Sequence, residues 1–110
     1  MEFIKLAGRA AEGIRLPAPA LLVADSLSSS DPQKTVVVAY KTDFEKTYNE
    51  PVSTFGGYAC DAFRILVAAI ERAGGAKDSV KIRDEIELTS NFVATTGIVN
   101  MSPRDRKSVV

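Results

Sequence analysis

The chain has 110 residues, a length that corresponds to one small domain. Apolar residues make up 45% and charged residues 25% of it, as in ordinary globular proteins. Lysine plus arginine and aspartate plus glutamate both total 14, so the formal net charge is zero. A neutral surface creates no long-range field that would attract nucleic acid or acidic lipid, and we therefore expect no nucleic-acid partner.

The residue types present also argue against catalysis. The sequence contains no histidine, which removes the commonest general base, the commonest metal ligand and the usual partner of a serine or cysteine nucleophile. Cys60 is the only cysteine, so it can form neither an internal disulfide nor a zinc site with a second thiol. Its apolar neighbours predict a small buried side chain rather than a reactive thiol. We expect no enzyme activity, no catalytic residue, no metal and no cofactor.

The first 30 residues predict short elements and loops. Residues 2–7 have the pattern of the last turns of a helix that begins without a cap, which indicates a fragment of something longer. Residues 13–17, GIRLP, alternate apolar and polar side chains and predict a short strand that Pro17 ends. Residues 18–27 contain Pro19 and fit either a helical turn or an irregular connection. No apolar run approaches the ~20 residues that cross a bilayer, and the start is not a secretory signal.

A first long helix is predicted from Asp31-Pro32 to about Asn49. Aspartate is a good cap, and a proline just after it has the helical φ and no N–H to lose. The stretch TVVVAY favours a strand, but an apolar stripe continues beyond it at helical spacing. The stripe consists of Val37, Tyr40, Phe44 and Tyr48.

A second long helix is predicted from about Ser53 or Tyr58 to Ala73, with Gly74-Gly75 as its C-terminal signal. It is apolar on nearly every side, which is typical of a helix buried on more than one side. The residues assigned to its main apolar face are Ala59, Ala62, Phe63, Leu66, Val67 and Ile70.

A shorter helix, capped by Asp78 or Ser79, is predicted to reach about Leu88. Residues 92–94 and 97–101 are strand candidates. Helices interleaved with short strands indicate an α/β fold. About three strands are too few for an independent sheet, which usually has four to six. We therefore expect helices packed on a few short strands, incomplete as a single chain.

Two patterns raise the possibility of a chemical site. Gly56-Gly57 opens an apolar helix, where free N–H groups could bind phosphate, yet TFGGYACDAF is neither a P-loop nor a dinucleotide fingerprint. Close backbone packing explains the two glycines better. Carboxylates at 84–87 alternate with cations and predict a solvated, salt-bridged face. Asp25 and Asp31 lack calcium-loop spacing, and the final SVV is a weak candidate for sheet-edge pairing.

Five segments in order, however, resemble a known family. They are GRAAEGIRLPAPALLV, DPQK, VVAYKTDFEKTYNEPVSTFGGYACDAF, AAIERAGG and TTGIVNMSP. This order is similar to the C-terminal part of type I periplasmic substrate-binding proteins that serve branched-chain amino-acid ABC transporters. The resemblance runs from Phe3 to about Asp105, and the fold it implies is part of the type I periplasmic-binding-protein-like fold.

The resemblance implies a division of the chain within a two-lobed protein that closes on its ligand. Residues 1–24 would match the end of the second lobe, residues 31–88 the return into the first lobe, and residues 92–110 the last crossover. Phe55, Gly56, Gly57 and Tyr58 would then face the cleft and touch the ligand, because glycines let a backbone approach closely and aromatic rings form an apolar wall.

The resemblance also implies the partners and the location. The ligand would be a branched-chain amino acid or a related amino or aromatic acid, and the closed protein would deliver it to an ABC permease in the inner membrane. The location would be the periplasm. The family's first-lobe segment has no counterpart here, Cys60 replaces a common tyrosine before Asp-Ala, and residues 104–108 depart from the family pattern. The chain thus keeps one wall of the pocket.

We further expect two copies to form a homodimer that covers the surplus apolar surface. The alternative function is an autonomous, non-catalytic protein-interaction module that uses the same exposed apolar surface. An enzyme is the third and weakest hypothesis.

Overall fold

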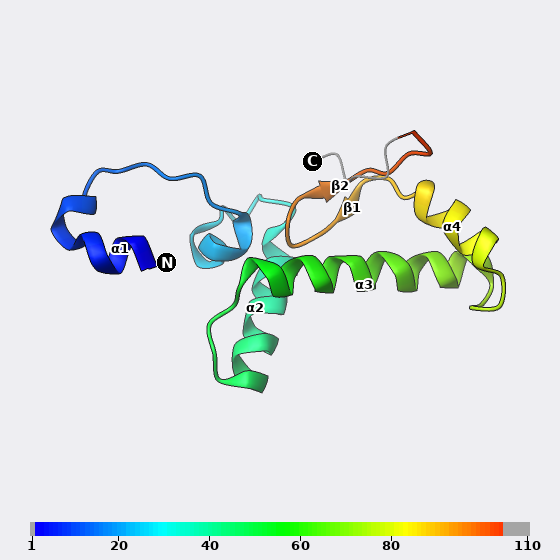
Figure 1. The fold of residues 1–110 in the computed structure, drawn as a ribbon, viewed down its shortest axis with the longest axis horizontal. Helices are drawn as coiled ribbons and strands as arrows, with labels where there is room; N and C mark the ends of the chain where they lie inside the picture. The colour runs from blue at the N-terminus through cyan, green and yellow to red at the C-terminus, as the bar shows by residue number, and fades with distance from the viewer. Residues whose placement is uncertain (1, 105–110) are drawn as a thin grey trace.

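A computed structural model of the chain describes residues 2–104. The part described is elongated, with principal extents of 55 × 32 × 27 Å. Figure 1 shows the long helix α3 at the centre, with helix α4 and a hairpin along one side of it and helix α2 crossing near its start. In chain order the elements are α1 (Glu2–Ala7), the 3₁₀ helices η1 (Gly8–Ala11) and η2 (Ala20–Ser26), α2 (Lys34–Tyr48), α3 (Thr54–Ala73), α4 (Ser79–Glu87), β1 (Phe92–Val93) and β2 (Ile98–Val99).

The two strands form a small antiparallel hairpin. Phe92 pairs with Val99 and Val93 pairs with Ile98, and the Ala94 N–H donates to the Gly97 carbonyl at 2.9 Å to close the turn. Both strand candidates near the C-terminus are thereby confirmed, although each strand is shorter than its apolar run. The prediction for the final SVV falls outside the described residues.

The strand predicted at residues 13–17 was wrong. The chain there is irregular and exposed, and it links η1 to η2 without pairing with either of the two described strands. A strand needs a partner for its N–H and C=O groups, and Pro17 can donate nothing to one. For residues 18–27, the helical alternative is the observed one, since η2 begins directly after Pro19.

Helix α2 is confirmed, but it starts two residues later than predicted, with Gln33 at the cap position and Lys34 as its first residue. Asp31 does not cap the helix directly: its carboxylate accepts a hydrogen bond from the Gln33 N–H at 2.8 Å and thereby shapes the turn that precedes the helix. At the other end, Asn49 takes the left-handed conformation with φ of 53° and ends the helix, two residues before Pro51.

Helix α3 begins and ends at sequence-encoded signals. The Ser53 hydroxyl accepts a hydrogen bond from the Gly56 N–H at 3.3 Å, as an N-cap does. Gly74 ends the helix in the left-handed conformation with φ of 79°. Of the two starts that the sequence left open, the structure has the earlier one, so both glycines lie inside the first turns.

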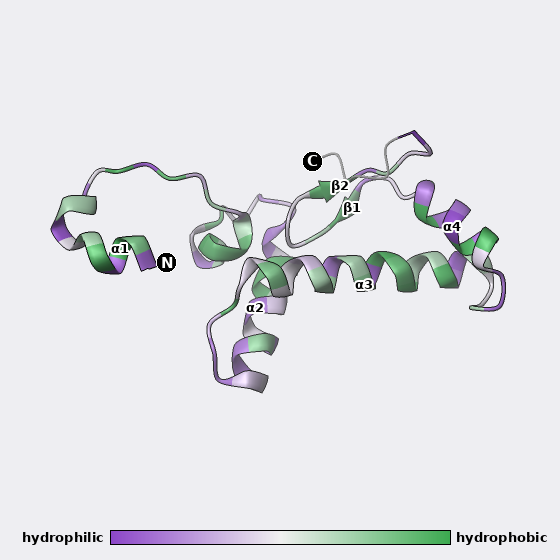
Figure 2. Cartoon of the chain, in the orientation of Figure 1, coloured by the Kyte–Doolittle hydropathy of each residue, from purple (hydrophilic) through white to green (hydrophobic). Residues whose placement is uncertain are grey.

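The buried face of α3 is not the one that we predicted. The predicted face is exposed or half-buried, and the packed face consists of Gly57, Asp61, Ile65, Ala69 and Ala73. Small side chains at three of these five positions let the hairpin and α4 approach the helix closely. Apolar residues occur around the whole helix, as Figure 2 shows, so hydropathy alone did not distinguish the two faces.

The core of the described part consists of two small clusters. Leu21, Ala24 and Val37 join η2 to α2, and Ile65 packs with Ala94 and Val99 to join α3 to the hairpin. Helix α1 contributes no buried residue. Figure 1 shows α1 apart from the other helices, at the end of an extended segment, and Leu6 of this helix is 83% exposed.

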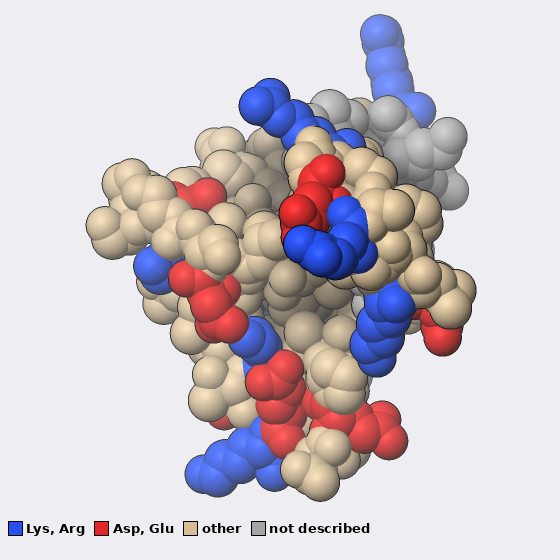
Figure 3. Space-filling model, turned by 90° about the vertical axis from the view of Figure 1, so that its left-hand side faces the viewer, with Lys and Arg blue, Asp and Glu red and all other residues tan. Residues whose placement is uncertain are grey.

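Apart from the buried Asp61, the charged groups of the described residues lie at or near the surface, and several form local pairs. Arg72 and Glu85 lie 3.0 Å apart, Arg83 pairs with Asp84, and Lys41 pairs with Asp25. Figure 3 shows both signs interspersed on the face viewed. The predicted salt-bridged face of the 79–87 helix is confirmed by the pairs that Arg72 and Arg83 make with it. Among the described residues, no helix is both long and apolar enough to cross a membrane.

Candidate functional site

The four predicted ligand contacts lie in the first turns of α3, but they do not form one surface. Phe55 and Tyr58 project outward, with 81% and 52% of their surface exposed. Gly57 is buried and Gly56 is half-buried, and both face neighbouring elements. Rings and glycines therefore point in different directions from the same helix start.

Packing accounts for both glycines. A Cβ atom at Gly57 would lie 2.8 Å from Leu21 Cδ2 and 3.0 Å from Thr95 Oγ1. A Cβ atom at Gly56 would lie 2.6 Å from the Tyr40 hydroxyl oxygen. The distances of 2.6 and 2.8 Å are shorter than real Cβ contacts, and 3.0 Å is at their lower limit, so glycine lets η2, α2 and the hairpin turn meet the start of α3. Close packing, the alternative to phosphate binding, is thus supported by a specific contact at each glycine. Ligand contact by Phe55 and Tyr58 stays a prediction.

A cavity of about 510 Å³ opens beside these glycines, between α2 and α3. Its volume falls within the range of about 300–1,000 Å³ that is usual for small-molecule sites. Phe55 and Tyr58 do not line it. The lining residues are Thr35, Val36, Ala39, Tyr40, Asp43, Phe44, Thr47, Tyr48, Cys60, Arg64 and Thr95.

Three aromatic rings from α2 form one wall of the cavity. The ring centroids of Tyr40 and Phe44 lie 5.8 Å apart, and those of Phe44 and Tyr48 lie 4.8 Å apart. Spacing by four residues places the rings above one another on the helix. They belong to the stripe read from the sequence, although only its first member, Val37, is buried. Three of the four members of the stripe therefore line a cavity, and Tyr40 packs against the Leu21, Ala24 and Val37 cluster as well.

The opposite wall is fixed by a buried carboxylate. Asp61 is 5% exposed, and its two oxygens accept four hydrogen bonds from the hairpin turn. The donors are the N–H groups of Thr95 at 2.8 Å and Thr96 at 3.1 Å, and the hydroxyls of Thr95 at 2.9 Å and Thr96 at 2.8 Å. A buried carboxylate is tolerated when it is hydrogen-bonded in this way. Asp61 thus holds the hairpin turn against α3.

The sequence reading missed this anchor. Neither Asp61, which is one of four charged residues in α3, nor Thr95-Thr96 was predicted to have a role. An acidic residue among apolar ones on a helix can mark a buried hydrogen-bonded group, and two adjacent threonines supply four donors in one turn. Which residues an aspartate would meet depends on the fold, because 34 positions separate it from Thr95.

Two further contacts position the hairpin beside the cavity. The Arg64 guanidinium lies over the Phe92 ring, 5.0 Å from its centroid, and donates to the Val93 carbonyl at 3.3 Å. The Gln33 side chain donates to the Ala94 carbonyl at 3.0 Å. The start of α2 and the middle of α3 are thus both hydrogen-bonded to the same hairpin.

Burial raises the pKa of two groups on the cavity walls. The Cys60 thiol is affected first by burial and then by the negative charge of Asp61. The Tyr40 phenol is affected first by burial and then by Cys60 and Asp61. A raised pKa keeps a thiol protonated at neutral pH, and the thiolate is the nucleophilic form. The cavity therefore has the character of a binding surface, with no activated nucleophile at Cys60.

Cation ligands are also sparse. Among residues 2–104, no three histidine, cysteine, aspartate or glutamate side chains come close enough together to hold a metal ion. The hydroxyls of Tyr40, Tyr48 and the cavity threonines are hydrogen-bonding groups, and the ring faces are apolar. Such walls suit a small organic molecule with an apolar body and a polar end.

Two solved structures share this fold. An extracellular ligand-binding receptor from Rhodopseudomonas palustris HaA2 matches 98% of the chain with a TM-score of 0.79 and 25% identity. A leucine-binding protein, LivK, from Thermotoga maritima MSB8 matches 96% of it with a TM-score of 0.60 and 28% identity. No protein-family model and no curated protein matches the sequence.

These matches define the class of fold. The chain has part of a type I periplasmic-binding-protein-like fold, as the sequence predicted. It spans only 32% of the receptor and 28% of the leucine-binding protein. Both of those proteins are binding proteins by name, and their remaining two thirds have no counterpart in these 110 residues.

Proposed function

We propose that this chain supplies one wall of the ligand cleft of a two-lobed solute-binding protein. The observation that carries the proposal is the match of nearly the whole chain, at a TM-score of 0.79, to a ligand-binding receptor. The start of α3 adds support, because it presents two exposed aromatic rings, Phe55 and Tyr58, next to glycines that hold the helix start in place.

The proposed ligand is a branched-chain amino acid or a related small amino or aromatic acid. The leucine-binding protein among the structural neighbours supports an amino acid, and ring faces suit an apolar or aromatic side chain. In this proposal residues 1–24 end the second lobe, residues 31–88 return to the first, and the chain from residue 92 makes the last crossover.

The proposed biological setting is that of an ABC transporter. The ligand-loaded protein would act in the periplasm and pass its ligand to a permease in the inner membrane. The extracellular receptor among the neighbours supports a location outside the cytoplasm. No catalytic step belongs to this function, in agreement with the raised pKa of the Cys60 thiol.

Calorimetric titration of the full chain tests the binding function. Leucine, valine, phenylalanine and benzoate are titrated into the folded protein, and saturable heat with one of them is the expected result. Far-UV circular dichroism on the same sample shows whether the helices are formed. A folded sample that gives no heat with any of the four ligands contradicts ligand binding by this chain.

A second candidate function is a non-catalytic protein-interaction module. The apolar side chains left exposed on α3 favour it, among them Phe63 at 65% and Leu66 at 40%. Monomeric soluble proteins rarely leave a large contiguous apolar patch uncovered. Absence of ligand heat, together with stable complex formation through α3, would favour this candidate over solute binding.

A further inference from the structure

One wall of the cavity between α2 and α3 combines aromatic rings with a carboxylate. The rings of Tyr40, Phe44 and Tyr48 follow one another along α2, and Asp43 of the same helix is also a lining residue. Asp43 follows Tyr40 by three positions, which places the two side chains on one face of the helix. Ring faces and carboxylates are groups that attract an organic cation.

The Asp43 carboxylate has no partner of its own. Among residues 2–104 it takes part in no ion pair and no side-chain hydrogen bond. Lys41, two positions earlier on α2, pairs with Asp25 instead. Asp43 is exposed, so a cationic ligand in the cavity can reach its carboxylate.

A second negative charge lies behind the opposite wall. The four groups that donate hydrogen bonds to Asp61 are uncharged N–H and hydroxyl groups, and no ion pair with a described residue neutralises its carboxylate. Burial first, and the negative charge of Asp61 in addition, raises the pKa of the Cys60 thiol and of the Tyr40 phenol. The field of this carboxylate therefore reaches both walls of the cavity.

The cation of Arg64 is directed toward the hairpin. Arg64 is a lining residue, but its guanidinium lies over the Phe92 ring, 5.0 Å from the centroid, and donates to the Val93 carbonyl at 3.3 Å. Neither Phe92 nor Val93 lines the cavity. The charges left facing the ring wall are thus negative on balance, which favours a positively charged ligand.

We propose that the α2–α3 cavity binds a small quaternary ammonium compound with an apolar or aromatic body. The rings of α2 would cover the methyl groups of the cation, and Asp43 would supply the counter-charge. The volume of about 510 Å³ is sufficient for such a molecule. This site is separate from the proposed ligand contacts at Phe55 and Tyr58, which do not line the cavity, and it does not depend on the solute-binding cleft.

Calorimetric titration of the full chain with phenyltrimethylammonium tests the proposal. Saturable heat is the expected result. Benzoate, which carries a carboxylate on the same ring, should bind at least about fivefold more weakly, because it meets the like charge of Asp43. Affinity for the cation should also fall as salt is raised from about 0.01 to 1 M, because salt screens the attraction of an exposed carboxylate.

Two variants, each with a matched control, test the two parts of the site. Asp43→Asn removes the counter-charge and should weaken binding by about fivefold. Glu45→Gln, which neutralises a carboxylate of the same helix outside the lining, should leave the affinity unchanged. Far-UV circular dichroism shows whether each variant is folded.

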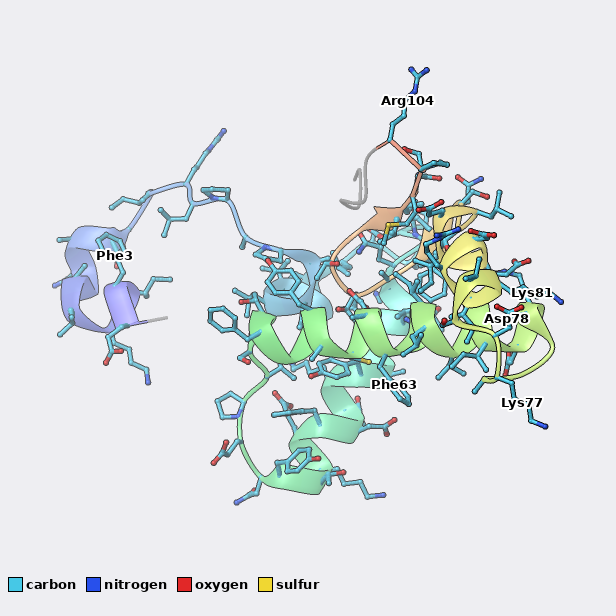
Figure 4. All side chains as sticks on the ribbon, turned by 45° about the vertical axis from the view of Figure 1, so that its right-hand side comes forward. Phe3, Phe63, Lys77, Asp78, Lys81 and Arg104 are labelled. Carbon is cyan, nitrogen blue, oxygen red and sulfur yellow. The ribbon has the colours of Figure 1, made fainter. Side chains whose placement is uncertain are left out.

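Phe44→Leu removes the middle ring but keeps an apolar side chain, and it should also weaken binding by about fivefold. Phe63→Leu is its control. Figure 4 shows Phe63 projecting from the side of α3 away from the hairpin, and this residue does not line the cavity.

Each result decides the proposal. Weaker binding in Asp43→Asn and Phe44→Leu, with unchanged affinity in the two controls, supports it. A folded chain that gives no saturable heat with phenyltrimethylammonium overturns it, as does equal affinity of Asp43→Asn and wild type, or benzoate that binds as tightly as the cation. Phe55→Ala/Tyr58→Ala should leave cation binding unchanged, and a loss there would place the cation at the start of α3 instead. The two ligand proposals can therefore fail separately.

Discussion

The carboxylate of Asp61 and the N–H of Thr95 lie 2.8 Å apart, although 34 positions separate them in the chain. This contact joins the longest helix to the turn of the hairpin, and the Thr96 N–H and the hydroxyls of Thr95 and Thr96 complete the set of four donors. This hydrogen bond joins residues that are far apart in the sequence, so it helps to fix the arrangement of α3, α4 and the hairpin. It also holds Thr95 at the edge of the α2–α3 cavity.

Asp61→Ala is expected to destabilise the fold by about 3 kcal/mol, because it leaves buried donors of Thr95 and Thr96 without an acceptor. Chemical denaturation followed by circular dichroism measures the change in free energy of unfolding. Asp84→Ala, which removes an exposed carboxylate with a side chain 53% accessible, serves as the control and should cost less than about 0.5 kcal/mol. Equal losses in the two variants would contradict a structural role for the Asp61 anchor.

Gly57→Ala is expected to lower stability by about 1–3 kcal/mol through overpacking, even though alanine favours helices over glycine by about 1 kcal/mol. The new Cβ atom would meet Leu21 Cδ2 at 2.8 Å. Thermal or urea unfolding measures the loss. In a double-mutant cycle, Leu21→Ala removes the clashing carbon, so Gly57→Ala should cost less in that background. Additive losses would show that the clash with Leu21 is not the cause.

Alkylation of Cys60 by iodoacetamide is expected to follow a pH profile whose midpoint lies above the ordinary value of 9.0, because burial raises the pKa of this thiol. At pH 8 the folded chain should react more slowly than the chain unfolded in urea. A midpoint at or below 9.0 would mean that the thiol is not shielded in solution.

The raised pKa of Cys60 also predicts the direction in which the free energy of unfolding changes with pH. The folded state binds this proton more tightly than the unfolded state, so the thiol's contribution to stability is complete below its unfolded pKa and is lost as pH rises through the folded pKa. The difference in free energy of unfolding between wild type and Cys60→Ser should therefore shrink above about pH 9. Lys41 titrates with the same sign and is present in both proteins, so its contribution cancels in the comparison. The part of the raised Tyr40 pKa that Cys60 causes is lost with the substitution and adds to the difference with the same sign.

The double substitution Phe55→Ala/Tyr58→Ala is expected to weaken binding of whichever ligand gives saturable heat by about tenfold or more, which corresponds to about 1.4 kcal/mol. Both rings are exposed at the start of α3, so their loss should leave the fold intact. Leu88→Ala removes an exposed side chain far from that start and should leave the affinity unchanged. Equal affinity of the double variant and wild type would contradict the proposed contacts.

Much of the local structure could be predicted from the sequence, because capping residues, helix-ending glycines and apolar runs act within a few residues. Ser53 and Gly74 bound α3, Asp78 caps α4 by accepting from the N–H groups of Val80 and Lys81, and two apolar runs around Thr95-Thr96 form the hairpin. The part of a type I periplasmic-binding-protein-like fold was also predicted, from the order of five segments. The prediction of a strand at residues 13–17 was wrong because this segment has no strand partner. A local sequence pattern does not show whether a partner strand exists.

The sequence by itself determined where α3 ends, at Gly74, and where α4 begins, after Asp78, since capping and helix termination act within a few residues. It also favoured close packing over phosphate binding as the reason for glycines at positions 56 and 57, without showing which elements pack there. Only the tertiary structure decided which side of α3 is buried. Apolar side chains occur on several sides of the helix, and the side that packs is the one whose side chains fit against the neighbouring elements. The small residues and Asp61 fit against the hairpin, and bulkier apolar side chains, Phe63 among them, are left facing outward.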